Sequence, residues 1–133
     1  MGEAVVLDSF ALLAHLEGEE RGSRVTALLK KAQSGKVDLY MSVINLGEVY
    51  YLTMRERGSD KAEEVLLLTG QLPVKIINPD MDMTVAAARL KAKHAVAYAD
   101  CFAAALAKGR AASLVTGDPE FKRFEDEIKI VWI

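Results

Sequence analysis

Near the start of the chain lies Ala4-Val5-Val6-Leu7-Asp8-Ser9, a short apolar run that ends in an aspartate and a serine. The run is too short for a buried helix and contains two valines, so it predicts a buried strand. Ser9 then opens a stretch that ends near Gly18 and carries apolar residues at helical spacing. The members of that stretch are Phe10, Leu12, Leu13 and Leu16. The chain therefore begins with a strand that leads directly into a helix.

The same alternation of strands and helices continues along the chain. Further apolar runs predict strands over 37–41, 74–77, 113–116 and 129–133. Helical patterns are predicted at about 19–34, 43–57, 60–68, 81–92 and 99–108, and a helix of one or two turns starts at Pro119. Most of the strands are unbroken apolar runs, which is typical of a mostly parallel sheet with helices on both faces. We expect one α/β domain, residues 1–133, with about five strands.

The composition is that of a folded, soluble protein. The chain has 133 residues, of which 51% are hydrophobic and 27% are charged, which excludes a disordered chain and suits one domain with a real core. No stretch approaches the length of a membrane-spanning apolar segment. The N-terminus lacks the features of a secretory signal, and the single cysteine, Cys101, has no partner for an internal disulfide. We therefore expect a cytoplasmic protein.

The net charge does not decide whether the chain binds nucleic acid. Seventeen basic residues stand against 19 acidic ones, which gives −2 at neutral pH. A strongly basic balance is the usual sign of a nucleic-acid partner, and it is missing here. If four of the acids are held around metal ions, however, 15 acidic residues remain against 17 basic ones, and the rest of the chain has a net charge of +2.

Two aspartates occupy the positions where open parallel sheets bind ligands, just beyond the carboxyl ends of strands. Asp8 directly follows the first predicted strand, and Asp118 follows the fourth in Leu114-Val115-Thr116-Gly117-Asp118-Pro119. Each also has a purely structural explanation, because aspartate is a favoured helix cap and proline is favoured at the first helical position. Taken singly, neither aspartate indicates a functional site.

Glu48 is harder to explain structurally. On the predicted helix over 43–57 its neighbours at helical spacing are Ile44, Tyr51 and Leu52, so it stands within an apolar stripe. A glutamate that points into a core is costly unless it is paired or bound to a metal. The structural alternative is an ion pair with an arginine such as Arg55.

Asp100 has the same character. Its neighbours at helical spacing are Ala103, Ala104 and Ala107, a face of small residues suited to close packing. The structural alternative is an aspartate in the first turn of a helix, where the helix dipole favours a negative charge.

The four acids together indicate a cation-binding site more strongly than any one of them does alone. No lysine or arginine lies within the four segments that carry them. Carboxylates ~5 Å apart repel by about 3 kcal/mol per pair at an effective dielectric near 20, so a cluster needs a cation. Oxygen ligands suit Mg²⁺ or Mn²⁺, whereas two histidines without zinc spacing do not indicate zinc. Hard cations held by carboxylates, with positions left for water and phosphate oxygens, are the equipment of phosphodiester hydrolysis.

At this point the residues match a family. The chain resembles the PIN-domain nucleases over essentially its whole length, and most closely the VapC-type toxins of toxin–antitoxin pairs. Four segments, in this order and spacing, carry the resemblance: Val5-Val6-Leu7-Asp8-Ser9, Ser42-Val43-Ile44-Asn45-Leu46-Gly47-Glu48-Val49, Tyr98-Ala99-Asp100-Cys101-Phe102-Ala103-Ala104-Ala105-Leu106-Ala107 and Leu114-Val115-Thr116-Gly117-Asp118-Pro119-Glu120-Phe121.

The resemblance implies a PIN fold and metal-dependent endonucleolytic cleavage of RNA. It places catalysis and the binding of Mg²⁺ or Mn²⁺ on four acids, with two hydroxyls as candidate support. The acids are Asp8, Glu48, Asp100 and Asp118, and the hydroxyls are those of Ser9 and Thr116. It also implies a cognate antitoxin and a homodimer. The dimer is expected further because the helices between Leu28 and Leu68 carry more apolar residues than one sheet face covers.

The sequence disfavours two other functions of such a sheet and leaves three alternatives open. A haloacid-dehalogenase-like phosphatase needs a second aspartate two residues after Asp8, where this chain has Phe10. A receiver domain needs a lysine at a late strand end, where this chain has Thr116, Gly117 and Asp118. A PIN nuclease of RNA processing or turnover, a non-catalytic PIN-like scaffold and a purely structural cation site stay as alternatives. Glu120 is close enough to Asp118 in sequence to support it.

Overall fold

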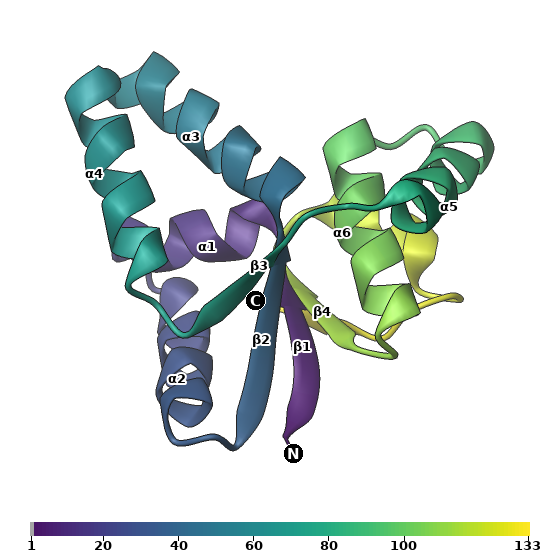
Figure 1. Cartoon of the computed structure of the whole chain (residues 1–133), viewed down its shortest axis with the longest axis horizontal. Coiled ribbons are helices and arrows are strands. Elements are labelled where there is room, and N and C mark those ends of the chain that lie inside the picture. The colour runs from purple at the N-terminus through teal and green to yellow at the C-terminus, as the bar shows by residue number, and fades with distance from the viewer. Residues whose placement is uncertain (1) are drawn as a thin grey trace.

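The computed structural model describes residues 2–133 and has the expected alternation of strands and helices (Figure 1). In chain order its elements are β1 (Glu3–Leu7), α1 (Ser9–Leu16), α2 (Gly22–Gln33), β2 (Val37–Ser42), α3 (Val43–Arg57), α4 (Ser59–Gly70), β3 (Val74–Ile77), α5 (Met81–Lys93), α6 (Tyr98–Gly109), β4 (Ser113–Thr116), the 3₁₀ helix η1 (Pro119–Phe124) and β5 (Ile130–Trp132).

All five strands form one parallel sheet in the order β3-β2-β1-β4-β5. The chain starts in the central strand, builds outward through β2 and β3, and then crosses to the other side for β4 and β5. The point where the strand order reverses lies between β1 and β4, which pair from Val5 opposite Ser113 to Leu7 opposite Val115. In sheets of this kind a crevice opens at the carboxyl ends of those two strands. The sequence prediction of a mostly parallel α/β sheet is confirmed.

Helices cover both faces of the sheet, as the unbroken apolar strands predict (Figure 1). Val5 and Leu7 pack with residues of α1 and α2 on one face, where α3 and α4 extend the layer. Val6, one residue between them, packs on the opposite face against α6 and η1. Alternating side chains of a strand point to opposite faces, so β1 is buried on both. The central strand is thereby held rigidly, and so is its carboxyl end.

Two helix starts differ from the sequence prediction. The second helix begins at Gly22 and not near Glu19, because Gly18 adopts a left-handed φ of 67° and the residues after it form a turn. Gly22 then lies so close to the first helix that a Cβ there would come within 2.2 Å of the Ala14 carbonyl oxygen. The helix predicted from about residue 60 begins one residue earlier, at Ser59, and its N-cap is Gly58, with φ of 91°.

Among the described residues, no helix combines the length and the apolar character that crossing a membrane requires.

Candidate metal centre

Asp8 lies at the carboxyl end of β1 and is almost fully buried, with 2% of its surface exposed. One carboxylate oxygen, Oδ1, accepts a hydrogen bond of 2.8 Å from the backbone N–H of Ala11 and so caps α1. The other oxygen, Oδ2, accepts a hydrogen bond from the hydroxyl of Thr116 on the neighbouring strand β4. Both oxygens of Asp8 are therefore held in a fixed direction.

Asp118 occupies the equivalent place after β4. Its Oδ1 accepts a hydrogen bond of 2.9 Å from the backbone N–H of Glu120 and caps η1, and its own N–H donates to Thr116 Oγ1 at 3.0 Å. Thr116, which is fully buried, thus connects the two aspartates. Capping and clustering are not alternatives at these positions, because each aspartate caps a helix with one oxygen and also acts through its charge on the carboxyl of Asp100.

Glu48 reaches the same region from α3, but not for the reason the sequence suggested. Its neighbours Ile44 and Tyr51 are 37% and 45% exposed, so the stripe they form with half-buried Glu48 is not a core stripe. The alternative ion pair is not formed either, since Arg55 lies over the ring of Tyr51 at 5.1 Å from its centroid. Instead, one oxygen of Glu48 accepts a hydrogen bond from the hydroxyl of Ser9.

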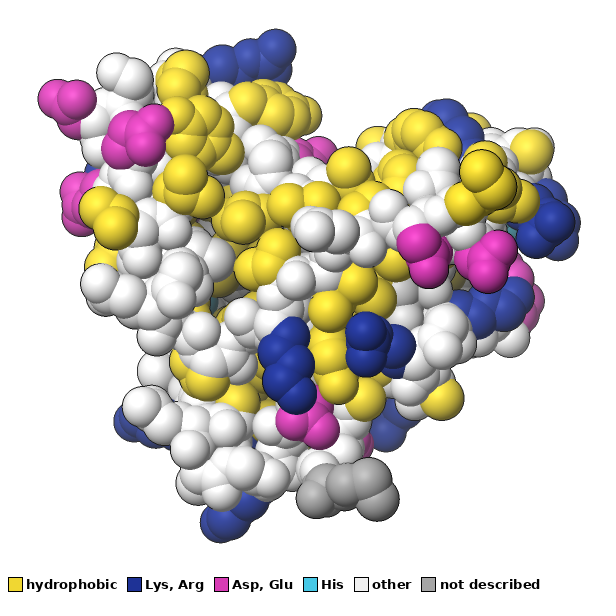
Figure 2. Space-filling view, in the orientation of Figure 1, with side chains coloured by type: hydrophobic (Ala, Val, Ile, Leu, Met, Phe, Trp, Pro, Cys, Tyr) yellow, Lys and Arg dark blue, Asp and Glu magenta, His cyan; other side chains and the backbone are white. Residues whose placement is uncertain are grey.

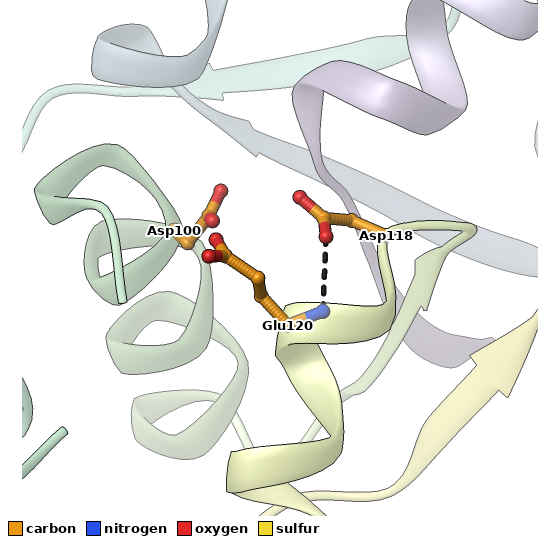
Figure 3. Close-up of side chains that lie close together, drawn as sticks. All are labelled: Asp100, Asp118 and Glu120. Carbon is orange, nitrogen blue, oxygen red and sulfur yellow. Dashed lines mark hydrogen bonds between the residues drawn. The ribbon is translucent and has the colours of Figure 1, made fainter. Parts of the chain in front are cut away.

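Asp100 lies in the first turn of α6 and is 7% exposed. Its carboxylate faces those of Asp118 and Glu120, and one oxygen from each of the three lies within 4.8 Å of the others. Figure 3 shows these side chains converging from α6 on one side and from the start of η1 on the other. Within residues 2–133 this is the only group of three or more potential metal ligands. Glu120, which is exposed, therefore belongs to the cluster itself.

Asp8 and Glu48 contribute charge to the same place. Burial first, and then the nearby carboxylates, together raise the pKa of the Asp100 carboxyl to about 8; these carboxylates are Asp118, Glu48, Asp8 and Glu120. Burial likewise raises the pKa of Asp8 to about 7, against hydrogen bonds from Thr116 and Ala11 that lower it. The structure thus groups Asp100 and Asp118 with Glu120, and it brings Asp8 and Glu48 near enough to act on the charge of Asp100.

The residues of this cluster fit a divalent cation. None of the ion pairs formed by the described residues involves any of the five acids. Five carboxylates supply only oxygen donors, which suit Mg²⁺ or Mn²⁺. One oxygen from each of Asp100, Asp118 and Glu120 lies within 4.8 Å of the other two, so these three residues would hold the cation.

Fold and cluster together define a small α/β domain with a group of carboxylates near the reversal point of a parallel sheet. The family model of the PIN domain matches residues 5–127, so the chain belongs to the PIN-domain family. This confirms the resemblance carried by the four sequence segments. No curated protein matches the sequence at a significant level.

Solved structures with the same fold include VapC toxins of VapBC pairs. VapBC2 from Rickettsia felis, bound to a DNA fragment from its promoter, is 18% identical with a TM-score of 0.74, covering 96% of this chain and 97% of that one. VapC20 from Mycobacterium tuberculosis, a sarcin-ricin loop cleaving toxin, is 17% identical with a TM-score of 0.69, covering 90% and 93%. FitAcB from Neisseria gonorrhoeae is 19% identical with a TM-score of 0.68, covering 95% of each chain.

Proposed function

We propose that this protein is a Mg²⁺- or Mn²⁺-dependent endoribonuclease that hydrolyses RNA phosphodiester bonds as the toxin of a toxin–antitoxin pair. One observation carries the proposal: three carboxylates, those of Asp100, Asp118 and Glu120, meet near the reversal point of a PIN-domain sheet, with Asp8 and Glu48 near enough to act on Asp100 and no lysine or arginine paired to any of them. A cluster that only stabilised the fold would have no reason to retain this repulsion. VapC20, which has a similar fold, is a sarcin-ricin loop cleaving toxin, and this supports the choice.

The chain's own residues have distinct tasks in such a reaction. The cation would be held by Asp100, Asp118 and Glu120. Further negative charge beside it would come from Asp8 and Glu48. A bound divalent cation supplies Lewis-acid activation of the phosphodiester and of the attacking water. The hydroxyl groups that donate to Asp8 and Glu48 fix both carboxylates before substrate arrives, as supporting groups around metal ligands commonly do. No side chain is required as a nucleophile.

The test is cleavage of single-stranded RNA by protein purified free of any bound inhibitor. We expect cleavage with Mg²⁺ or Mn²⁺, none in EDTA, and poor turnover with Ca²⁺. Asp118→Asn should abolish cleavage while keeping the cap on η1, because asparagine caps a helix nearly as well as aspartate. Asp80→Asn is the matched control, since Asp80 caps α5 in the same way and is exposed outside the cluster. Failure on a broad RNA panel with both metals would favour the non-catalytic scaffold.

The toxin role needs a test of its own, because PIN nucleases also process and degrade RNA. Several of the similar folds were solved as toxin–antitoxin complexes, and this supports an antitoxin partner here. Such a partner should place a basic side chain among the carboxylates and so replace the cation. A short neighbouring reading frame that encodes a DNA-binding protein is expected. A complex whose acidic cluster stays empty would contradict the inhibitory contact.

A homodimer is also part of the proposal. Large hydrophobic side chains remain exposed on α3, α4 and α5, among them Met54, Leu67 and Met81. Figure 2 shows hydrophobic side chains gathered over α3 and α4 and continuing across the middle of the molecule. Contiguous apolar surface of this kind marks protein interfaces. Light scattering that gives a monomer at micromolar concentration would refute the dimer.

A further inference from the structure

Asn45 is a fully buried amide at the meeting point of three acid-bearing segments. It lies on α3, one turn before Glu48, and none of its surface is exposed. Its side-chain nitrogen Nδ2 donates to the backbone carbonyl of Ala99 at 3.1 Å and to the hydroxyl oxygen of Ser9 at 3.4 Å. Each contact ends beside an acid of the cluster, because Ala99 directly precedes Asp100 and Ser9 directly follows Asp8.

The contact with Ser9 sets the direction of a hydroxyl. A serine hydroxyl has one proton to donate and two lone pairs with which to accept. Ser9 Oγ lies near two acceptors. One is the backbone carbonyl oxygen of Asn45, at 3.1 Å, and the other, which is closer, is the carboxylate of Glu48. When the amide of Asn45 donates to Ser9 Oγ, the Ser9 proton is left for the charged acceptor. Hydrogen bonds to charged groups are the stronger ones, so the chain of donors ends on Glu48.

The other end of the amide indicates that its donors are what matter. Asn45 Oδ1 is buried and has no hydrogen-bond partner among the described residues. An unpaired buried acceptor has a desolvation cost that an apolar side chain of similar size would avoid. An amide at this position is therefore less favourable for stability than an apolar side chain. What an apolar side chain could not supply is the two hydrogen bonds that the amide donates.

We propose that Asn45 is a positioning residue that fixes Asp100, which would hold the divalent cation, and Glu48 beside it. It acts on Glu48 through the Ser9 hydroxyl and on Asp100 through the Ala99 carbonyl. The proposal rests on the cation site of the proposed function, and it requires no particular nucleic-acid substrate. Mutation of groups that orient metal ligands typically lowers metal affinity 10- to 100-fold.

The test measures Mn²⁺ binding by titration calorimetry, without nucleic acid, alongside urea unfolding in EDTA. Asn45→Leu removes both donated hydrogen bonds and keeps the number and branching of the side-chain heavy atoms, and we expect it to weaken Mn²⁺ binding about 10- to 100-fold. Thr53→Val is the matched control, because the Thr53 hydroxyl is a buried group on the same helix that donates only to the carbonyl of Val49, at 2.8 Å. That control should change the urea midpoint without changing Mn²⁺ affinity.

A second pair of variants keeps the test decisive if Asn45→Leu does not fold. Ser9→Ala and Asn45→Thr are smaller changes, and if Asn45 acts through Ser9 their effects on Mn²⁺ affinity will be less than additive. Unchanged Mn²⁺ affinity in folded Asn45 variants would overturn the positioning role. A wild-type protein that binds Mn²⁺ but cuts no RNA would overturn the proposed function alone. A wild type that binds no Mn²⁺ would overturn both.

Discussion

In the absence of metal, the Asp8→Asn variant should become increasingly more stable than the wild type as the pH rises. The side chain is buried at 2% exposure, and this burial raises its pKa from 3.8 to about 7. Well below pH 3.8 the carboxyl group is protonated in both the folded and the unfolded chain, so its ionisation does not affect stability. Between pH 4 and 7 the unfolded chain releases the proton and the folded chain retains it, so the free energy of unfolding falls as the pH rises.

The size of this loss follows from the shift. A pKa raised from 3.8 to about 7 corresponds to roughly 4 kcal/mol of stability, fully present below the unfolded pKa and lost as the pH passes through about 7. About 2 to 3 kcal/mol of that loss falls between pH 5 and pH 8.5. Asparagine cannot ionise and can still cap α1 at the N–H of Ala11. The stability of Asp8→Asn relative to wild type should therefore increase by this amount over the same pH interval.

Urea unfolding in EDTA at pH 5 and pH 8.5 measures the effect, and repeating it with Mg²⁺ reverses the sign. Saturating Mg²⁺ should stabilise the wild type more than the variant, because the ion binds the folded state only. Asp80→Asn is again the control, since Asp80 accepts the same 2.8 Å cap hydrogen bond, from Met83, on the exposed start of α5. A difference between Asp8→Asn and wild type that stays flat from pH 5 to pH 8.5 would refute the argument.

Three further predictions concern the residues around the aspartates. Thr116→Val removes the hydroxyl that connects the two strand-end aspartates. We expect the free energy of unfolding to fall by about 1–3 kcal/mol and the Mg²⁺-induced rise in Tm to become smaller. Thr116→Ser keeps the hydroxyl and should stay close to wild type in both measurements. Glu120→Gln changes an exposed side chain, so metal-free stability should stay within about 0.5 kcal/mol while calorimetry shows weaker Mn²⁺ binding; equal binding would remove Glu120 from the cluster. Gly117→Ala would place a Cβ 2.3 Å from Cε1 of the Phe10 ring, so the ring or the loop that carries Asp118 must shift, and we expect RNA cleavage to fall; wild-type cleavage rates would contradict a shift of the loop.

Much of the fold was predictable because local and tertiary preferences agree. The strands Val74–Ile77 and Ser113–Thr116 and the helix Val43–Arg57 have the predicted bounds, since glycine, proline or a capping serine stands beside their ends. The positions of Asp8 and Asp118 followed from the same agreement. Once two strands are known to be parallel, their carboxyl ends must lie at one edge of the sheet.

The rest of the cluster depends on contacts that one sequence does not display. Helical periodicity placed Glu48 in a core stripe, but periodicity cannot tell a core face from an exposed apolar face, and Ile44 is exposed. Glu120 enters the cluster because a 3₁₀ turn after Asp118 directs its side chain back toward α6. Asn45 gave no signal in the sequence, since its hydrogen bond to Ala99 spans 54 positions.

The hydrogen bond between Thr116 and Asp8 joins residues 108 positions apart, and this separation has a consequence during protein synthesis. Domains form as the chain emerges, at about 5–20 residues per second. Roughly 5 to 20 s therefore pass between the translation of Asp8 and that of the strand that completes its surroundings. Over that interval the ribosome carries a chain whose acids are still dispersed. Truncated products that end before β4 lack the assembled cluster, and a partner that recognises the cluster can bind only finished molecules.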